Sequence, residues 1–310
     1  MTRLSRLRVN VFPGGFNWPL FVAIEMGCFA REGIAVELQA TTGSMAQMTD
    51  LAAGNFEIAM TGFDNVVAYA EGQGEAPIGA QAEFFAFLGS DDSFLNLVAQ
   101  PDISCAADLR GRAVSVDAAT TGYAFALFDM LDRAGLKEDD YAVVKVGGMA
   151  QRFDDLTRGS NAATLLSTPY DLLARRAGLR VLARLEGPYQ GNVGAAKRSW
   201  ARSNPSLVVA YIKGYLEAVR WLYEPANKSQ ACDILVRNVA TMTLELAAAS
   251  YAILLAPSGG FFRDGRVQEN GVRKVLRLRS RYAAERRTLS DPSKYVDLHY
   301  WELARGAGRP

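Results

Sequence analysis

The stretch that decides the fold is LRVNVFPGGFNWPLFVAIEMGCFAREGIAVEL, which spans Leu7–Leu38. Its first part, Leu7–Phe12, has the character of a strand, and a Pro-Gly-Gly break separates it from an apolar, helix-like run over Trp18–Arg31. Gly33 suits a left-handed helix end, and Ala35–Thr41 alternates with the period of a strand. A strand, a helix and a second strand in this order predict two parallel strands joined by a helix.

The same alternation continues as far as Leu185. Further strands are expected at Glu57–Thr61, Ala76–Glu83, Leu95–Ala99, Ala113–Val116, Ala142–Val146, Ala162–Leu166 and Leu179–Leu185. Helices are expected at Met45–Ala53, from Gly62 to Tyr69, and at Gly122–Ala134, Met149–Leu156 and Pro169–Arg176. Helical patterns then dominate at Pro205–Tyr223, Ser229–Val239, Thr243–Leu255, Arg266–Ala283 and a short helix in the tail. We therefore predict an α/β protein with mostly parallel sheets and a helical C-terminal part.

Length and charge narrow the class of protein. The chain has 310 residues, of which 49% are hydrophobic, which is enough for one large domain or two smaller ones. It carries 34 Lys plus Arg against 33 Asp plus Glu, so no nucleic-acid or acidic-membrane partner is expected. No apolar run reaches the ~18 residues of a membrane-spanning helix. The first residues lack the apolar core of a signal peptide, so the chain as written begins in the cytoplasm, although a trimmed or mis-assigned start would look the same.

Residues that usually carry catalysis or bind metals are sparse. Cys28, Cys105 and Cys232 lie far apart and form no CxxC pair, which gives neither a zinc site nor a disulfide framework. The single histidine, His299, lies near the C-terminus, and the GxSxG, HExxH and P-loop motifs are missing. Gly72-x-Gly74 lacks the third glycine of a dinucleotide-binding turn. We expect no catalytic constellation, no metal and no cofactor.

Six strand-to-helix junctions share a glycine or small residue, a short polar group and often an aromatic ring. They are Gly14–Trp18, Thr42–Ser44, Thr61–Asn65, Thr120–Tyr123, Gly147–Met149 and Ser167–Tyr170. In a parallel α/β sheet such junctions lie along one edge, where free N–H groups of helix N-termini, hydroxyls and rings can bind a ligand. Each junction alone also suits an ordinary turn or N-cap, Ser44, Asp64 and Thr121 being good capping residues.

Four segments resemble the NMT1/THI5-like, SsuA/TauA-type periplasmic solute-binding proteins. They are Asn17–Leu38, Gly43-Ser44 followed by Leu51–Ala59, Ala107–Val114 with its Asp-Leu-Arg-Gly-Arg, and Ser203–Val208 with its Asn-Pro. Their order and spacing carry the likeness, which runs from about Leu7 to Trp301, because no single motif among them is specific.

The resemblance implies a type II-like, two-lobed periplasmic binding protein fold with a cleft between the lobes. Residues 1–94 and 190–310 would form the first lobe, and residues 95–189 the second. The implied function is capture of a small organic solute, of the sulfonate, aromatic acid or pyrimidine class, for an ABC permease and ATPase. The protein would be a periplasmic monomer without cofactor. The cleft residues implied are Gly15, Phe16, Asn17, Trp18, Gly43, Ser44, Phe63, Asp64, Asn65, Thr120, Thr121, Tyr123 and Tyr170.

Two departures from the family keep other functions open. The missing leader leaves a cytoplasmic location open, and Asp64 in the cleft would repel an anion unless it only caps its helix. THI5-like pyrimidine synthases consume a histidine of their own and carry a cysteine-rich motif, and the desulfinases of this type use a cysteine in the first strand-to-helix loop. The single histidine of this chain, His299, lies in the tail, its cysteines form no cysteine-rich motif, and the first strand-to-helix loop contains no cysteine. The alternatives are a cytoplasmic lyase or hydrolase on the same fold and a soluble ligand sensor.

Overall fold

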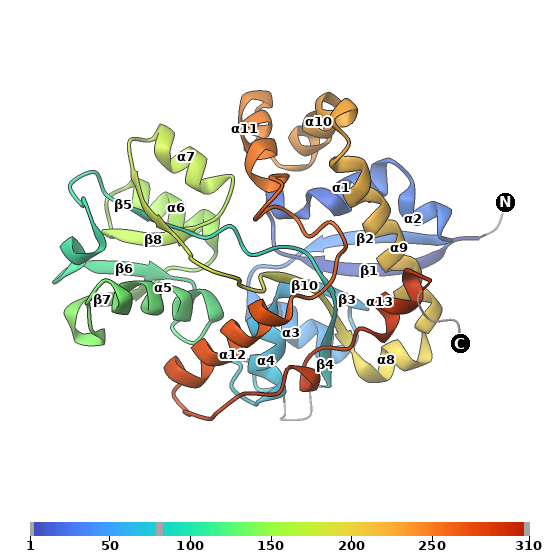
Figure 1. The fold of residues 1–310 in the computed structure, drawn as a ribbon, viewed down its shortest axis with the longest axis horizontal. Coiled ribbons are helices and arrows are strands. Elements are labelled where there is room, and N and C mark those ends of the chain that lie inside the picture. Colours follow the sequence, from blue (N-terminus) through green and yellow to red (C-terminus); the bar gives the residue numbers. More distant parts are fainter. Residues whose placement is uncertain (1–2, 79–82, 307–310) are drawn as a thin grey trace.

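The computed structural model describes residues 3–78 and 83–306, which form two lobes, each built on a five-stranded sheet with helices against it (Figure 1). We call the half that contains β1 lobe I and the half that contains β6 lobe II. The strands of lobe I are β1 (Ser5–Val11), β2 (Ile34–Ala40), β3 (Ile58–Gly62), β4 (Phe84–Gly89) and β10 (Asn192–Lys197), in the order β2-β1-β3-β10-β4. The strands of lobe II are β5 (Asn96–Ala99), β6 (Ala113–Val116), β7 (Ala142–Lys145), β8 (Ala163–Leu166) and β9 (Arg180–Arg184), in the order β7-β6-β8-β5-β9.

Both sheets are mixed, whereas the sequence predicted mostly parallel sheets. In lobe I, β1 is parallel to β2 and β3, but β10 is antiparallel to β3 and β4. In lobe II, β6 is parallel to β7 and β8, but β5 is antiparallel to β8 and β9. The reason is that β5 follows β4 out of lobe I and β10 follows β9 out of lobe II. Neither strand arrives through the helical crossover that a parallel neighbour requires.

The helices of lobe I follow the strands much as predicted. They are α1 (Trp18–Glu25), α2 (Cys28–Arg31), α3 (Ser44–Ala53) and α4 (Phe63–Ala70), with the 3-10 turn η1 (Gly15–Asn17) before α1. The predicted single helix over Trp18–Arg31 is wrong in one respect: it breaks before α2, where Gly27 takes a φ of +69°. Ser44 is the first residue of α3 and not its N-cap, which is Gly43.

Lobe II contains three helices that begin at the ends of strands. They are α5 (Gly122–Arg133), α6 (Met149–Thr157) and α7 (Tyr170–Arg176), with the 3-10 turns η2 (Ala106–Leu109) and η3 (Glu138–Asp140). The predicted N-cap Thr121 is confirmed, since its side chain accepts a hydrogen bond from the Ala124 backbone N–H at 3.4 Å.

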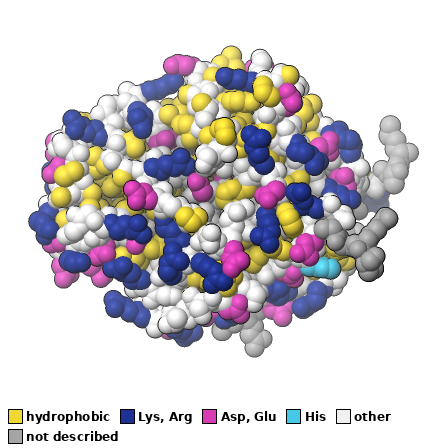
Figure 2. All heavy atoms as spheres, viewed as in Figure 1, with side chains coloured by type: hydrophobic (Ala, Val, Ile, Leu, Met, Phe, Trp, Pro, Cys, Tyr) yellow, Lys and Arg dark blue, Asp and Glu magenta, His cyan; other side chains and the backbone are white. Residues whose placement is uncertain are grey.

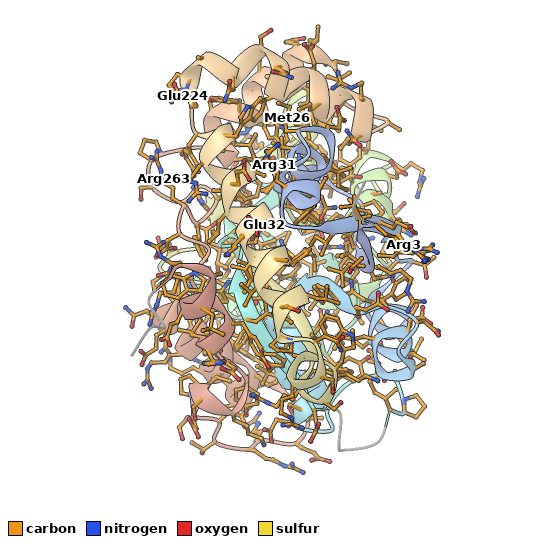
Figure 3. The ribbon with its side chains drawn as sticks, turned by 90° about the vertical axis from the view of Figure 1, so that its right-hand side faces the viewer. Arg3, Met26, Arg31, Glu32, Glu224 and Arg263 are labelled. Atoms are coloured by element: carbon orange, nitrogen blue, oxygen red, sulfur yellow. The ribbon has the colours of Figure 1, made fainter. Side chains whose placement is uncertain are left out.

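The C-terminal part is helical, as predicted, and covers lobe I. Its helices are α8 (Arg198–Ser203), α9 (Pro205–Leu222), α10 (Lys228–Asn238), α11 (Leu244–Leu254), α12 (Glu269–Tyr282) and α13 (His299–Ala304), with the 3-10 turns η4 (Pro225–Asn227) and η5 (Pro292–Lys294). Helix α9 crosses the outer face of lobe I beside α2, where Arg31 binds Glu217 at 2.6 Å and Glu32 lies 3.9 Å from Lys213 (Figure 3). Helix α12 contacts α4 of lobe I and α5 of lobe II, and so joins the two halves (Figure 1).

Two strands differ from prediction. The strand expected at Ala76–Glu83 is not seen where it can be compared: residues 76–78 and 83 form no strand, β4 begins at Phe84, and residues 79–82 lie outside the described residues. Strand β10 was not predicted, because its sequence NVGAAK has little of the β-branched and aromatic character that marks strands. Within the described chain, the helices lack the length and apolar character needed to cross a bilayer.

Candidate functional site

The edges of the two lobes that carry the strand-to-helix junctions face each other. Gly15 of η1 lies against lobe II, because a Cβ atom added there would be 3.4 Å from Pro169 Cδ and 3.8 Å from the Thr168 carbonyl oxygen. A Cβ atom added to Gly122, at the start of α5, would be 2.4 Å from Asp64 Cβ of lobe I. Four of the six junctions predicted to line a cleft are therefore in contact in pairs across the interface: Gly14–Trp18 with Ser167–Tyr170, and Thr61–Asn65 with Thr120–Tyr123.

Asp64 forms a buried ion pair at this interface. Arg279 of α12 donates from Nε to Oδ1 at 2.8 Å and from Nη2 to Oδ2 at 2.5 Å, and the side chains are 1% (Arg279) and 6% (Asp64) exposed. Arg279 also donates to the Thr120 carbonyl oxygen of lobe II at 2.9 Å, and its guanidinium lies 5.0 Å from the centre of the Phe125 ring. The Asp64 carboxylate makes no capping hydrogen bond to the backbone of α4. Its negative charge is neutralised by Arg279.

Arg152 of α6 is a buried cation on the lobe II side. Its Nη1 donates to the Leu165 carbonyl oxygen at 2.7 Å and to Thr164 Oγ1 at 3.4 Å, and its Nε donates to the Gly147 carbonyl oxygen at 3.1 Å. Across residues 3–78 and 83–306, no carboxylate lies within 4.0 Å of its guanidinium. Burial lowers the pKa of Arg152, and the more distant Asp117 opposes that shift. A guanidinium held by neutral acceptors alone keeps its positive charge available to an anion.

Two tyrosines belong to the same region. Burial raises the pKa of Tyr123, the second residue of α5, and the charges of Asp91 and Asp117 add to the rise while Arg152 opposes it. Burial also raises the pKa of Tyr189, which precedes β10, and the nearby Asp64 carboxylate adds to it. Both phenols therefore stay protonated at neutral pH and can donate hydrogen bonds. We call Tyr123, Arg152 and Tyr189 the interface cluster.

Several buried polar atoms near the interface have no hydrogen-bond partner among the described residues. Thr168 Oγ1 and Asp171 Oδ1 lie near each other at the start of α7, next to Gly15, but form no hydrogen bond of good geometry, and Ser93 Oγ, near Tyr123, lies where the chain leaves β4 for β5. Burial raises the pKa of Asp171, whose other oxygen accepts from Asn96 Nδ2 at 3.1 Å. Native proteins rarely leave such atoms unpaired, so they mark places where a bound molecule could supply partners.

Some of the predicted cleft residues do lie at the interface. Gly15, Asp64 and Thr120 make the contacts given above, and Thr120 Oγ1 donates to Glu75 Oε1 at 2.9 Å. Thr121, besides capping α5, donates to Asp117 Oδ1 at 2.7 Å. Tyr123 belongs to the interface cluster.

Other predicted residues turn into the protein. Trp18 is fully buried and donates from Nε1 to the Ala231 carbonyl oxygen of α10 at 3.0 Å, so its ring packs in the core of lobe I. Phe63 is also fully buried, in the hydrophobic core beneath α4. Asn17 Nδ2 donates to the Phe12 carbonyl oxygen at 2.6 Å and so closes its own turn, and Asn65 Nδ2 donates to Thr61 Oγ1 at 2.9 Å.

The remaining predicted residues are half-buried. The Phe16 ring covers the Cβ position of Gly14, and Tyr170 packs on Phe153 with ring centres 5.7 Å apart. Gly43 has no atom within 4 Å of an added Cβ atom, so Gly43 and the adjacent Ser44 leave open space at the start of α3.

Sequence reasoning missed Arg152, Tyr189 and Arg279. The Gly147-Gly148 junction before α6 was recognised, but a lone arginine in the first turns of a polar helix gives no signal of burial. Tyr189 precedes a strand that was not predicted, and Arg279 lies far along the chain from its partner. Within the described residues, no group of three or more His, Cys, Asp or Glu side chains is arranged to hold a metal ion.

Residues 3–236 match the sequence profile of the NMT1-like family. The chain belongs to the NMT1-like family. This confirms the resemblance drawn from its four segments. A search of curated protein sequences gave no significant match.

Solved structures share the fold of this NMT1-like protein. The periplasmic nitrate-binding protein NrtA from Synechocystis PCC 6803 has a TM-score of 0.79 and 14% identity, over 98% of this chain and 89% of that one. The alkanesulfonate-binding protein SsuA from Xanthomonas axonopodis pv. citri, bound to MOPS, has a TM-score of 0.74 and 14% identity, over 96% and 99%. The desulfurization enzyme DSZB has a TM-score of 0.65 and 15% identity, over 98% and 100%. The NMT1-like protein therefore has the predicted two-lobed α/β fold of periplasmic binding proteins, a fold that an enzyme also uses.

Proposed function

We propose that this NMT1-like protein captures a small organic anion between its two lobes and presents it to an ABC permease and ATPase in the periplasm. The observation that carries the proposal is Arg152, a buried guanidinium at the facing edge of lobe II without a carboxylate partner within 4.0 Å in the described chain. An uncompensated buried charge costs several kcal/mol, and an anion taken from solution offsets that cost. The planar fork of an arginine matches a carboxylate or a sulfonate.

The ion pair of Asp64 supports an anionic ligand. A free carboxylate at this edge would repel a sulfonate or a carboxylate, but Arg279 neutralises Asp64 within the protein. Of the ligand classes implied by the family, aromatic acids and sulfonates fit Arg152, whereas a neutral pyrimidine leaves its charge uncompensated. The protonated hydroxyls of Tyr123 and Tyr189 add donors and their rings add an apolar wall.

Binding of this kind requires the lobes to move. Because Gly15 contacts Pro169 and Gly122 contacts Asp64, a solute can enter the interface only when the lobes separate, and it would be enclosed when they return. The segments that join the lobes are tied together: the Asp91 carboxylate accepts from the backbone N–H groups of Ser93 and Asn192 at 2.8 and 3.0 Å. This favours rotation of two rigid halves about the joining segments.

The two buried cysteines and the histidine favour binding over covalent catalysis; the third cysteine, Cys105, is exposed at the N-cap of η2. Cys28 and Cys232 are buried, and burial raises the pKa of both thiols, whereas a nucleophilic cysteine needs a lowered pKa. His299 lies exposed at the start of α13, where its ring contacts Tyr300. A lyase or hydrolase would have to use a different constellation.

The test is a titration of the purified protein with benzoate, benzenesulfonate, short alkanesulfonates and neutral pyrimidines, followed by calorimetry and thermal unfolding. We expect an organic anion to bind, and at 100 times its dissociation constant to add about 2.7 kcal/mol to the free energy of unfolding. Arg152→Lys should weaken binding about tenfold or more because the ammonium lacks the planar fork. Arg220→Gln, an exposed arginine on α9, serves as the control.

Three results would speak against the proposal. If a neutral pyrimidine binds more tightly than any anion, the proposed role of Arg152 in binding an anion is wrong. Unchanged affinity in Arg152→Lys would move the site elsewhere. Recovery of a chemically altered ligand after incubation would favour the lyase or hydrolase.

A further inference from the structure

A second positively charged site lies between α5 and α12. There the structure leaves an open groove of about 670 Å³. Its charged lining residues are Asp129, Arg133, Arg273, Lys274, Arg277 and Arg281. Lys and Arg side chains gather over these two helices in Figure 2. We call this hollow the α5–α12 groove; none of the interface cluster lines it.

The charges around the α5–α12 groove do not balance. Five of the lining side chains are cationic and one is acidic. Arg133, Arg273 and Arg281 have acidic partners, namely Asp129 at 2.9 Å, Glu269 at 2.6 Å and Asp132 at 2.7 Å. Lys274 and Arg277 take part in no ion pair within the part of the chain that the structure describes. Neither cation therefore has a direct ion-pair partner there.

Lys274 is the unusual member of the pair. Its side chain is only 5% exposed, and its Nζ donates to the Glu186 carbonyl oxygen, a neutral acceptor. Burial lowers the pKa of Lys274, and the charges of Arg133 and Arg277 lower it further, while Asp129 and Glu186 oppose them. A buried ammonium placed beside two guanidiniums is repelled by both, so an anion among the three would replace repulsion by attraction.

We propose that the α5–α12 groove binds a small, multiply charged anion of the organic phosphate class, held by Lys274, Arg277 and Arg133. Lys274 and Arg277 are three residues apart on α12 and so lie on one side of that helix, while Arg133 ends α5 on the facing wall. The two cations without an ion-pair partner, together with Arg133, suit a dianion or polyanion better than a single carboxylate. The half-buried Leu289 supplies an apolar surface for the organic part.

The experiment measures binding of inorganic pyrophosphate and of phenyl phosphate to the full chain by calorimetry, at constant ionic strength. Saturable binding is expected for both. Arg277→Gln should weaken it at least tenfold, and Arg277→Glu should abolish it, because Arg277 is exposed and its replacement should not disturb folding. Arg220→Gln, on α9, should bind as the unaltered protein does. Lys274→Met should also lose binding; if this buried variant fails to fold, the two Arg277 variants still decide.

Absence of saturable pyrophosphate binding at millimolar concentration would overturn the proposal. Equal binding by Arg277→Glu and the unaltered protein would also overturn it. Loss of pyrophosphate binding in Arg152→Lys but not in Arg277→Glu would assign the anion to the interface between the lobes. Neither this site nor its test depends on the identity of the solute bound between the lobes.

Discussion

Arg279 of α12 donates to both carboxylate oxygens of Asp64 in lobe I, at 2.8 and 2.5 Å, and to the Thr120 carbonyl oxygen of lobe II, at 2.9 Å. One guanidinium from the C-terminal helical part therefore binds the first turn of α4 and the residues just before α5. Since all of these groups are buried or half-buried, the contact ties the two lobes together where they meet.

Removing the carboxylate should be costly. Asp64→Ala leaves the Arg279 guanidinium buried without its anion, for which we expect a loss of about 3–5 kcal/mol in the free energy of unfolding. Asp64→Leu combined with Arg279→Met should recover most of that loss, because it removes both charges and keeps apolar volume. Urea unfolding followed by circular dichroism measures both. Glu25→Ala, which breaks the exposed pair with Arg237, is the control and should cost less than about 1 kcal/mol. A cost for Asp64→Ala no larger than that of the control would contradict the prediction.

Contact between the lobes can be tested at Gly122. An alanine there would place its Cβ atom 2.4 Å from Asp64 Cβ and 2.7 Å from Asp64 Cγ, so lobe I and lobe II must move apart. We expect Gly122→Ala to raise the radius of gyration measured by small-angle X-ray scattering, and to cost roughly 1–3 kcal/mol through overpacking. Gly62→Ala is the matched control, because an added Cβ atom at Gly62 meets no atom within 4 Å. Identical behaviour of the two variants would mean that the lobes do not touch at this point in solution.

Local signals explain which parts of the fold were predictable from the sequence. Thr121 and Gly122 mark the start of α5 within a few residues, and the structure places the cap and the helix there. Strand β10 has no such signal: its Gly and Ala residues become a strand only because β3 and β4 offer edges on either side. The start of β4 was misplaced because the apolar alternation of Ala76–Glu83 runs directly into the buried strand that follows.

The candidate site depends on contacts that no local pattern contains. Asp64 and Arg279 are 215 residues apart, so the sequence left open whether Asp64 faces a ligand or caps its helix, and the structure gives a third outcome. Arg152 belongs to the helix MAQRFDDLT, whose charges suggest a solvated surface. It is buried because its side chain reaches back to the carbonyl oxygens of Gly147 and Leu165, a path set by the packing of α6 on β8.

The hydroxyl of Tyr123 should contribute to solute affinity if the proposed function holds. A hydrogen bond from a phenol to an anionic ligand is worth roughly 1.5–3 kcal/mol, so Tyr123→Phe should weaken binding about 10- to 100-fold. Tyr223→Phe also removes a tyrosine hydroxyl, one that donates to the Phe261 carbonyl oxygen at 2.7 Å at the end of α9, and should leave affinity unchanged. Calorimetry with the anion found in the titration gives the affinities, and thermal unfolding confirms that both variants fold. Equal affinities of Tyr123→Phe and the unaltered protein for the anion would mean that the Tyr123 hydroxyl does not bind the ligand.

Asp171 should make stability depend on pH. One of its carboxylate oxygens accepts from Asn96, and the other is buried near Thr168 without a hydrogen bond of good geometry in the described chain. Burial raises the pKa of Asp171 above the ordinary 3.8, and the nearby Thr168 hydroxyl opposes that rise. The folded protein therefore holds this proton more tightly than the unfolded chain does. The stabilisation is complete below the unfolded pKa and is lost as the pH rises through the folded pKa.

Asp171→Asn cannot ionise, so it avoids this loss. We expect the free energy of unfolding of the variant, relative to the unaltered protein, to increase from about pH 4 to about pH 7, by roughly 1.4 kcal/mol for each unit by which the folded pKa is raised. Urea unfolding at several pH values measures the difference. Asp233→Asn, on the exposed side of α10, is the control for replacing a solvent-exposed carboxylate by an amide. The prediction is wrong if the difference in free energy of unfolding between Asp171→Asn and the unaltered protein stays constant or shrinks as the pH rises. Asp171 would then ionise as easily in the folded protein as in the unfolded chain, and its second carboxylate oxygen would have to be hydrated.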